Sequence, residues 1–349
     1  MKLPQTAAGI ASTWTLVFLA GIPGVGAATA TPTPTPPKYV AMGDSFASGE
    51  GTGDYYPGTD TGADTCHRSP HAYGPQVAQT NGLDLTFVAC SGAATWDIVH
   101  PNQSDPEPAQ ISQLSSDTKL VTLTVGGNDV GFTQVLGACL HGTGIPNFDK
   151  NANGTDYGYG CKGNLKLRAV VTTRERALGG GAGASAPGPV TRSIVALKNV
   201  LGQIHAAAPS AKITVVGYPK LFGTSKSNYF TKKYSPAPGA SVSGSFCDVG
   251  NTPGVWSVQY EDALWMDSET QNVNAILAKS VSDAGRAGNF SAVFADPTPV
   301  FDGHSFCGGK SNWINPIHLD GSTPWSGSFH PTIDGQSAYA QLLTPTVTG

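Results

Sequence analysis

Five short apolar runs, each bounded by turn residues and separated by segments of helical spacing, constrain this chain most. The clearest helical pattern runs from Val190 to Ala208, where apolar residues recur on one face. Strands that alternate with helices predict a parallel sheet covered on both faces. The predicted strands are Lys38 to Met42, Leu83 to Ala89, Lys119 to Val125, Lys212 to Gly217 and Phe290 to Ala295. Ligands of such sheets bind beyond the carboxyl ends of the strands, so the residues after each run are the first candidates for a site.

The amino-terminal residues differ in composition from the rest of the 349-residue chain. Residues 1–30 have the pattern of a secretory signal peptide, with an apolar stretch from Thr13 to Val25 followed by small residues. A membrane anchor is the alternative, but the stretch is short and contains Pro23. After a Thr/Pro-rich leader at residues 31–37, we place a single catalytic domain at residues 38–349. We expect a secreted, extracellular protein without a transmembrane anchor.

The charge balance argues against one class of partner. The chain has 20 Lys and Arg against 24 Asp and Glu, and its formal net charge is −4. It therefore has no basic field that would collect a polyanion. We expect no nucleic-acid partner, and we expect a monomer.

Six cysteines in an exported chain are expected to pair. Fifteen connectivities are open in principle. The cysteines fall into sequential couples, each of which closes a loop around a Gly-rich segment, and this favours the pairs Cys66–Cys90, Cys139–Cys161 and Cys247–Cys307. Metal-binding cysteines usually stand in close pairs such as C-x-x-C, and the sequence contains none, so we expect no metal.

Long stretches rich in glycine and polar residues separate the periodic segments. They are predicted to be surface insertions: Glu50 to Ser69, Gly137 to Gly163, Gly179 to Gly188 and Ser225 to Gly254. Three Asn-X-Ser/Thr sequons, at Asn102, Asn153 and Asn289, are candidate glycosylation sites if the host is eukaryotic.

A serine follows the first predicted strand directly. Gly43, Asp44 and Ser45 form a tight turn that exposes the Ser45 hydroxyl at the carboxyl end of the strand. A hydroxyl is a weak nucleophile and needs an adjacent base, so a serine in a turn is by itself only a turn residue. We interpret Asp44 as a cap for backbone N–H groups rather than as a second catalytic acid.

Two further turns place hydrogen-bond donors at the same edge of the sheet. Ser91, Gly92 and Ala93 follow the second strand, and the sequence GGND at residues 126–129 follows the third. Acyl transfer builds negative charge on a carbonyl oxygen, which donors fixed in advance stabilise. The predicted donors are the backbone N–H groups of Ser45 and Gly92 and the side-chain amide of Asn128. Asp129 is interpreted as a brace for that loop.

A histidine near the carboxyl terminus is the candidate base. His330 precedes Pro331, which suits the first turn of a helix. A histidine of ordinary pKa can accept the serine proton and return it to a leaving group. The other seven histidines, His67 among them, accompany no motif and are interpreted as surface or hydrogen-bonded residues. Trp313 and Trp325, in the loops before His330, either form the wall of a binding pocket or pack beneath a loop.

Taken in order, the elements GDSFASG, SGA, GGND and FHP resemble the SGNH (GDSL-type) hydrolase superfamily, and most closely its secreted branch with three sequential disulfides. The resemblance runs from Tyr39 to Leu343. It implies a three-layer α/β/α flavodoxin-like fold with about five parallel strands. It also implies that Ser45 is the nucleophile, that His330 is the base, and that Ser45, Gly92 and Asn128 form the oxyanion hole. Ester hydrolysis without a metal or organic cofactor follows from the same resemblance.

One departure from that family concerns the group that orients the histidine. Many members have an Asp three residues before the histidine, where this chain has Gly327. We therefore predict a Ser-His dyad in which the carbonyl of Gly327 or Ser326 accepts the imidazole N–H. A carboxylate from Asp320 or Asp302 is the alternative.

The sequence thus predicts a secreted serine esterase or lipase that acts through an acyl-enzyme on carboxylic esters of lipid, polysaccharide or plant-polymer type. The alternative is a non-catalytic secreted carbohydrate-binding or adhesion module on the same fold. A peptidase or an acetyl esterase is a third hypothesis, since fold alone does not separate these chemistries. The substrate stays open because the pocket is built from loops.

Overall fold

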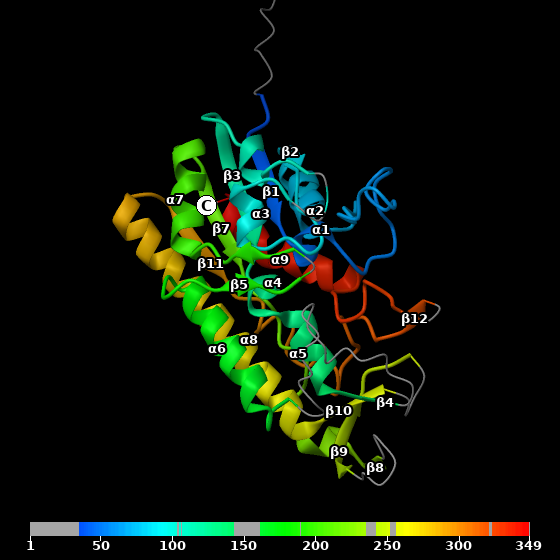
Figure 1. Cartoon of the computed structure of the whole chain (residues 1–349). Coiled ribbons are helices and arrows are strands. Elements are labelled where there is room, and N and C mark those ends of the chain that lie inside the picture. The colour runs from blue at the N-terminus through cyan, green and yellow to red at the C-terminus, as the bar shows by residue number, and fades with distance from the viewer. Residues whose placement is uncertain are drawn as a thin grey trace, which may run out of the picture. The chain divides into compact units, whose positions relative to one another are not determined.

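In a computed structural model of the chain, five parallel strands form the central sheet. They are β1 (Lys38–Gly43), β2 (Asp84–Phe87), β3 (Thr118–Thr124), β7 (Lys212–Val216) and β11 (Ala292–Ala295). Their order across the sheet, β11–β7–β3–β1–β2, is the flavodoxin-like order, which confirms the expected fold class (Figure 1). Each predicted strand is present, and its ends differ from the prediction by no more than two residues.

The two central strands β1 and β3 are buried on both faces of the sheet. All residues of β1 after Lys38 are buried, as are all residues of β3 except Lys119. Such continuous burial requires an uninterrupted apolar run rather than the alternation of a half-exposed strand. The burial of these two central strands therefore explains why they are recognisable in the sequence as mainly apolar runs, whereas the edge strands β2 and β11 are only partly buried.

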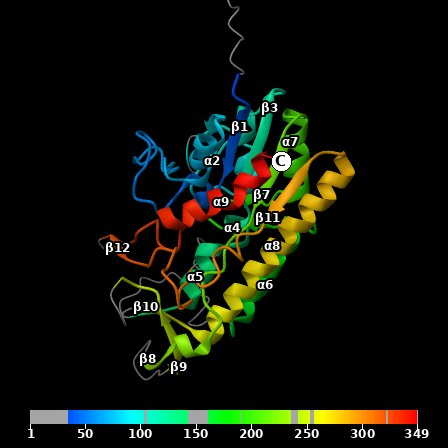
Figure 2. The same cartoon turned by 180° about the vertical axis from the view of Figure 1, so that it is seen from behind.

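Helices cover both faces of this sheet. Figure 1 shows α3 (Thr95–Val99) and α7 (Leu197–Ala207) in front of it, and Figure 2, turned by 180°, shows α8 (Tyr260–Gly288) and α9 (Ile333–Thr348) in front. The helix α2 (Tyr73–Asn81) packs against α9, and α7 packs against both α3 and α8. These packed helices supply the two outer layers of an α/β/α arrangement. The remaining helices are α1 (Ser45–Ser48), α4 (Gly127–Val130), α5 (Phe132–Cys139) and α6 (Leu165–Leu178).

The helix predicted to begin at Val190 begins only at Leu197. Before it, β6 (Arg192–Ser193) pairs with β5 (Ser185–Ala186) in a short antiparallel ladder. The Arg192 side chain pairs with Asp97, and the backbone N–H of Val195 donates to the Thr95 hydroxyl at 2.9 Å. Tertiary hydrogen bonds thus replace the first turns that the apolar spacing predicted.

A second, antiparallel sheet was not predicted. It contains β4 (Leu140–Gly142), β10 (Trp256–Gln259), β9 (Val242–Asp248) and β8 (Phe230–Tyr234). Most of these residues lie in stretches interpreted as surface insertions. Their polar, Gly-rich composition gives a weak strand signal, and pairing between distant segments rather than local pattern forms the sheet.

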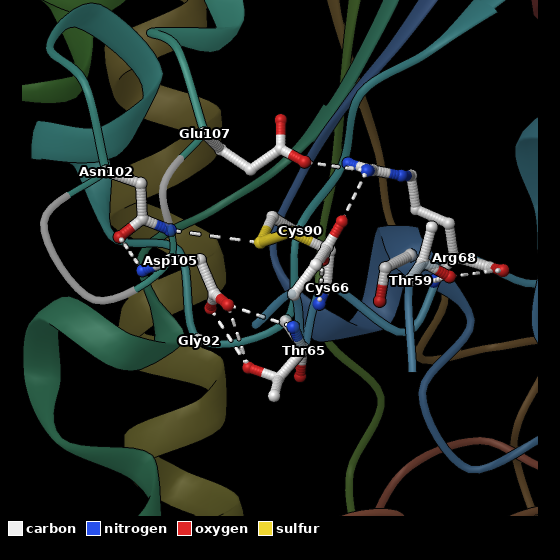
Figure 3. The surroundings of a disulfide bond; sticks show 12 residues. Thr59, Thr65, Cys66, Arg68, Cys90, Gly92, Asn102, Asp105 and Glu107 are labelled. Atoms are coloured by element: carbon white, nitrogen blue, oxygen red, sulfur yellow. Dashed lines mark hydrogen bonds and ion pairs between the residues drawn. A yellow bond between two sulfur atoms is a disulfide. The ribbon is translucent and has the colours of Figure 1, made fainter. Parts of the chain in front are cut away.

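The three expected disulfides are formed, Cys66–Cys90, Cys139–Cys161 and Cys247–Cys307. The first joins the loop before α2 to the turn that follows β2 (Figure 3). Beside it the Asp105 carboxylate accepts hydrogen bonds from Thr65, and the Ser91 N–H donates to the Cys66 carbonyl at 3.1 Å. Cysteine and carboxylate groups lie close together here, but the two sulfurs are bonded to each other and offer no thiolate to a metal.

The structure describes residues 35–102, 105, 107–142, 161–188, 190–234, 242–251, 256–320 and 323–348. The predicted signal peptide and the sequon at Asn153 lie outside these residues. Asn102 is buried with its amide hydrogen-bonded, whereas Asn289 is exposed at the end of α8. Within the described ranges, none of the helices combines the length and the apolarity that crossing a bilayer requires.

Candidate active site

The Ser45 turn is built by the close approach of two strands. At Gly43, φ is +133°, and a Cβ there would lie 2.3 Å from the Thr124 carbonyl oxygen of β3, so only glycine fits. Asp44 caps α1, because its carboxylate accepts the Phe46 N–H at 3.0 Å. Ser45 is therefore the first residue of a short helix at the carboxyl end of β1, the position that the sequence predicted, but it is buried rather than exposed.

His330 lies within hydrogen-bond distance of Ser45. Its Nε2 is 2.8 Å from the Ser45 Oγ, and its Nδ1 is 3.1 Å from the carbonyl oxygen of Ser328. A carbonyl can only accept, so Nδ1 carries the proton and Nε2 has a lone pair directed at the serine hydroxyl. This is the tautomer that a general base needs.

The carbonyl at Nδ1 is not one of the two that were predicted. It belongs to Ser328, while the carbonyl of Gly327 accepts the backbone N–H of His330 at 3.1 Å. The turn before the histidine folds back on itself, with Phe329 at a φ of +63°, and this brings the carbonyl two residues upstream against the ring. The carbonyl of Ser326 contributes more weakly, by raising the pKa of His330.

The alternative carboxylates do not take that place in the described part of the chain. Asp302 is exposed, and its backbone carbonyl accepts a hydrogen bond from Lys310. The side chain of Asp320 lies outside what the structure describes. Both ring nitrogens of His330 already have partners, so no carboxylate of the described residues touches the imidazole.

Burial dominates the protonation of His330. It lowers the pKa of the imidazole below 6.5, while the field of Glu50 and the hydrogen bonds to the carbonyls of Ser328 and Ser326 act in the opposite direction. The imidazole is therefore neutral near pH 7. A neutral imidazole at that pH can accept a proton from Ser45.

The three predicted oxyanion donors surround one pocket of about 310 Å³, which Ser45, Gly92, Asn128 and His330 all line. Gly92 has a φ of +77°, which turns its backbone toward the pocket without a side chain. One N–H of the Asn128 amide donates to the Ala93 carbonyl at 3.0 Å, which leaves the second for a ligand. Within the described residues, the backbone N–H groups of Ser45 and Gly92 have no acceptor.

Buried polar side chains tie these turns together. The Tyr218 hydroxyl donates to Asp44 and accepts the Gly127 N–H at 2.9 Å, so it joins the serine turn to the Asn128 turn. Asp129 accepts hydrogen bonds from the backbone N–H and the hydroxyl of Thr95. Asp129 therefore braces the loop, in agreement with its interpretation from the sequence.

Two contributors to the site have no local signal in the sequence. Arg192 is buried, pairs with Asp97 and donates to the Gly92 carbonyl at 3.4 Å. Tyr218 follows the strand β7 without any motif. The two tryptophans before His330 have different places. Trp325 lines the pocket, whereas Trp313 packs against His304 and Phe301.

Comparison with known proteins identifies the family of this chain. The GDSL-like Lipase/Acylhydrolase family matches residues 41–338. A lipase of Streptomyces rimosus is 28% identical over 339 residues, which cover 97% of this chain and 96% of that relative. The crystal structure of phospholipase A1 from Streptomyces albidoflavus NA297 shares 27% identity at a TM-score of 0.60 and covers 89% of this chain and 99% of that one.

The crystal structure of the extracellular lipase from Streptomyces rimosus is also similar, with 25% identity, a TM-score of 0.57 and coverage of 88% of this chain and 98% of that one. The matched region covers nearly the whole length of each of these relatives. The protein therefore belongs to the GDSL-like lipase/acylhydrolase family and is a carboxylic ester hydrolase.

Proposed function

We propose that Ser45 and His330 form a catalytic dyad that hydrolyses lipid esters through an acyl-enzyme. The observation that carries this proposal is the 2.8 Å approach of the His330 Nε2 to the Ser45 Oγ, with the opposite ring nitrogen held by a carbonyl. His330 takes the hydroxyl proton as Oγ bonds to the ester carbonyl carbon. The N–H groups of Ser45 and Gly92 and the Asn128 amide hold the resulting oxyanion.

The protons balance over two half-reactions. When the tetrahedral intermediate collapses, the C–O bond to the alcohol breaks, and His330 returns its proton to the leaving oxygen. Water then attacks the acyl-enzyme while His330 accepts a proton from it. The second collapse breaks the bond to Ser45, which recovers that proton, and the carboxylic acid leaves.

An apolar groove beside the catalytic pocket favours a long acyl chain. Phe132 and Leu136 of α5 line both spaces, so the groove continues the pocket. The rest of the groove is walled mainly by apolar side chains, among them Val171 of α6 and Val273 of α8. Its free volume is only about 50 Å³, so a long acyl chain fits only if the side chains that line the groove move apart. The names of the relatives, lipase and phospholipase A1, support the same substrate class.

We further propose that the enzyme is secreted and acts as a monomer. Disulfides form in oxidising compartments, and a similar structure is that of an extracellular lipase. All proposed catalytic groups come from one chain, so the site needs no second copy.

The test is an ester panel measured on the native enzyme and on Ser45→Ala. We expect the native enzyme to hydrolyse long-chain acyl esters and to be labelled by a fluorophosphonate, and we expect Ser45→Ala to lose both properties while melting at an unchanged temperature. Turnover by Ser45→Ala would refute the proposed nucleophile. A preference for acetyl over long acyl groups would refute the lipid substrate and favour an acetyl esterase.

A further inference from the structure

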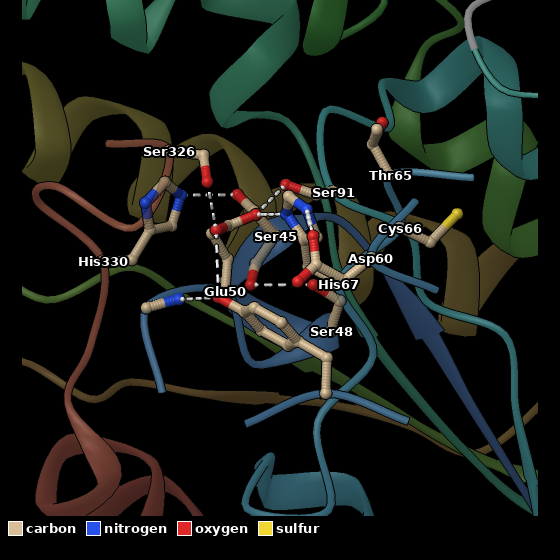
Figure 4. Close-up of polar contacts among 12 residues, drawn as sticks. Ser45, Ser48, Glu50, Asp60, Thr65, Cys66, His67, Ser91, Ser326 and His330 are labelled. Atoms are coloured by element: carbon tan, nitrogen blue, oxygen red, sulfur yellow. Dashed lines mark hydrogen bonds and ion pairs between the residues drawn. The ribbon is translucent and has the colours of Figure 1, made fainter. Parts of the chain in front are cut away.

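A buried carboxylate lies behind the dyad. Glu50 lies two residues after the end of α1 and is 0% exposed. Its carboxylate accepts hydrogen bonds from the hydroxyls of Ser91 at 2.7 Å and Ser326 at 2.8 Å, from the Tyr55 hydroxyl at 3.2 Å, and from the Nδ1 of His67 (Figure 4). A fully buried carboxylate is costly unless it is hydrogen-bonded in this way.

Contacts of Glu50 reach three of the loops that carry the proposed chemistry, those of Ser45, Gly92 and His330. The backbone N–H of Glu50 donates to the Ser45 carbonyl at 3.1 Å. Ser91 directly precedes Gly92 of the proposed oxyanion hole. Ser326 begins the turn whose Ser328 carbonyl holds the imidazole. The backbone and side chain of this one residue therefore connect the serine turn, the Gly92 turn and the turn before His330.

The carboxylate is charged despite its burial. Burial alone would raise the pKa of Glu50, but the hydrogen bond from His67, the fields of His330 and His67 and the hydrogen bond from Ser91 lower it to about 2. Beyond His67 lies Asp60, whose carboxylate is 3.2 Å from the His67 Nε2. The titratable groups that act on Glu50 are Tyr55, His67 and His330, and Asp60 lies behind His67.

The geometry of His67 indicates that this arrangement is enforced. His67 is a non-glycine residue at a φ of +48°, a conformation that side chains seldom adopt. Its ring stacks on Tyr55 at 4.8 Å between centroids and is held between Glu50 and Asp60. Backbone strain of this kind persists where surrounding contacts over-determine it, often beside a functional site.

Proton transfer from Ser45 creates an imidazolium at His330, and the group on its Nδ1 is a neutral carbonyl. We propose that Glu50 is a positioning residue of this enzyme, whose buried anion stabilises the imidazolium without touching the ring while its hydrogen bonds hold the Ser91 and Ser326 loops in place. It supplies the negative charge that the carboxylate of a catalytic triad would supply by direct contact. The inference rests on the proposed Ser45–His330 mechanism.

The deciding variant is Glu50→Gln, which removes the charge and keeps the size of the side chain. Because the field of Glu50 raises the pKa of His330, its loss should move the acid limb of kcat/KM to lower pH. If the limb moves by about one pH unit, the same lost interaction should lower kcat by about tenfold. A purely structural role would reduce the melting temperature and the active fraction without moving the limb. A limb at its native position would therefore overturn the proposal.

A second variant, His67→Gln, should move the acid limb in the opposite direction. Burial alone would lower the pKa of His67, but its hydrogen bond to Glu50 and the fields of Glu50 and Asp60 raise it, and the positive charge of His67 lowers the pKa of His330. His67→Gln keeps an N–H donor and loses that charge, so the acid limb should move to higher pH. If Glu50→Gln does not fold, the His67→Gln variant decides. An acid limb of its kcat/KM profile that stays at the native pH or moves to lower pH overturns the proposal.

Glu50→Asp keeps the charge and should restore most of the native limb position. An NMR titration of the His330 ring in the Ser45→Ala background should show the same shifts without any need for activity. Ring shifts of these signs support the electrostatic role of Glu50, and their absence overturns it. Failure of the dyad itself would appear elsewhere, as ester hydrolysis that survives Ser45→Ala.

Discussion

Asn128 allows the sharpest test of the proposed oxyanion hole, because its two amide N–H groups have separate partners. One donates to the Ala93 carbonyl at 3.0 Å, and the other is left to face the pocket that Ser45 and His330 line. Asn128→Ala removes both. The first loss should lower the stability of the fold, and the second should raise the barrier of the chemical step.

The two losses differ in magnitude. One neutral hydrogen bond to a backbone carbonyl is worth about 0.5–1.5 kcal/mol of unfolding free energy. An oxyanion donor is worth about 2.7–4 kcal/mol of barrier, or about 10²–10³ in kcat. We therefore expect Asn128→Ala to remain folded at 25 °C and to lose most of its kcat with little change in KM.

Asn81→Ala is a matched control. The Asn81 amide donates to the Val77 carbonyl at 2.8 Å at the end of α2, away from the residues that line the pocket. It should lose similar stability and keep its kcat. The assay is steady-state hydrolysis of p-nitrophenyl butyrate beside urea unfolding of each variant. A kcat for Asn128→Ala within about tenfold of the native value would refute the assignment of this donor.

Three further predictions follow from the same structure. Burial lowers the pKa of His330 below 6.5, and the base must be neutral to accept a proton. We therefore expect kcat/KM to persist down to pH 6.5 and to fall as the pH drops through that lower pKa. An acid limb centred above pH 6.5 would contradict this expectation. The Cys66–Cys90 bond closes a loop with a sequence separation of 24 residues, so replacing both cysteines with Ser should lower the free energy of unfolding in urea by about 3.5 kcal/mol. An unchanged free energy of unfolding would contradict a stabilising role of this disulfide. Val171→Trp should fill the apolar groove and lower kcat/KM for palmitoyl esters by about tenfold relative to butyryl esters, whereas equal effects on both would show that the acyl chain lies elsewhere.

The strands of the central sheet and the turns that follow them could be predicted because each depends on short-range pattern. A buried parallel strand must be a continuous apolar run, and a strand that ends beside its neighbour needs a glycine such as Gly43. Ser45, Gly92 and Asn128 come directly after such strands. Parallel strands end at one edge of the sheet, so these residues had to meet there.

The start of α7 and the antiparallel sheet could not be predicted, since long-range partners decide them. Apolar spacing continues upstream of Leu197, but the Arg192 and Thr95 contacts compete with the helix and end it early. Strands in Gly-rich segments form only because a distant segment pairs with them. No local window of the sequence contains that partner.

The sequence by itself determined the chemistry: a strand-borne serine, donors at the same sheet edge and a histidine at a helix entrance. Only the tertiary structure decided how the histidine is oriented and which charge acts on it. The Ser328 carbonyl reaches Nδ1 because of one turn with a positive φ. The Glu50 carboxylate is held by four hydroxyl and imidazole donors, of which Ser91 and Ser326 lie far from it in the sequence. Periodicity specifies which residues share a strand or a helix face, whereas the path of a loop depends on contacts between segments far apart in the chain.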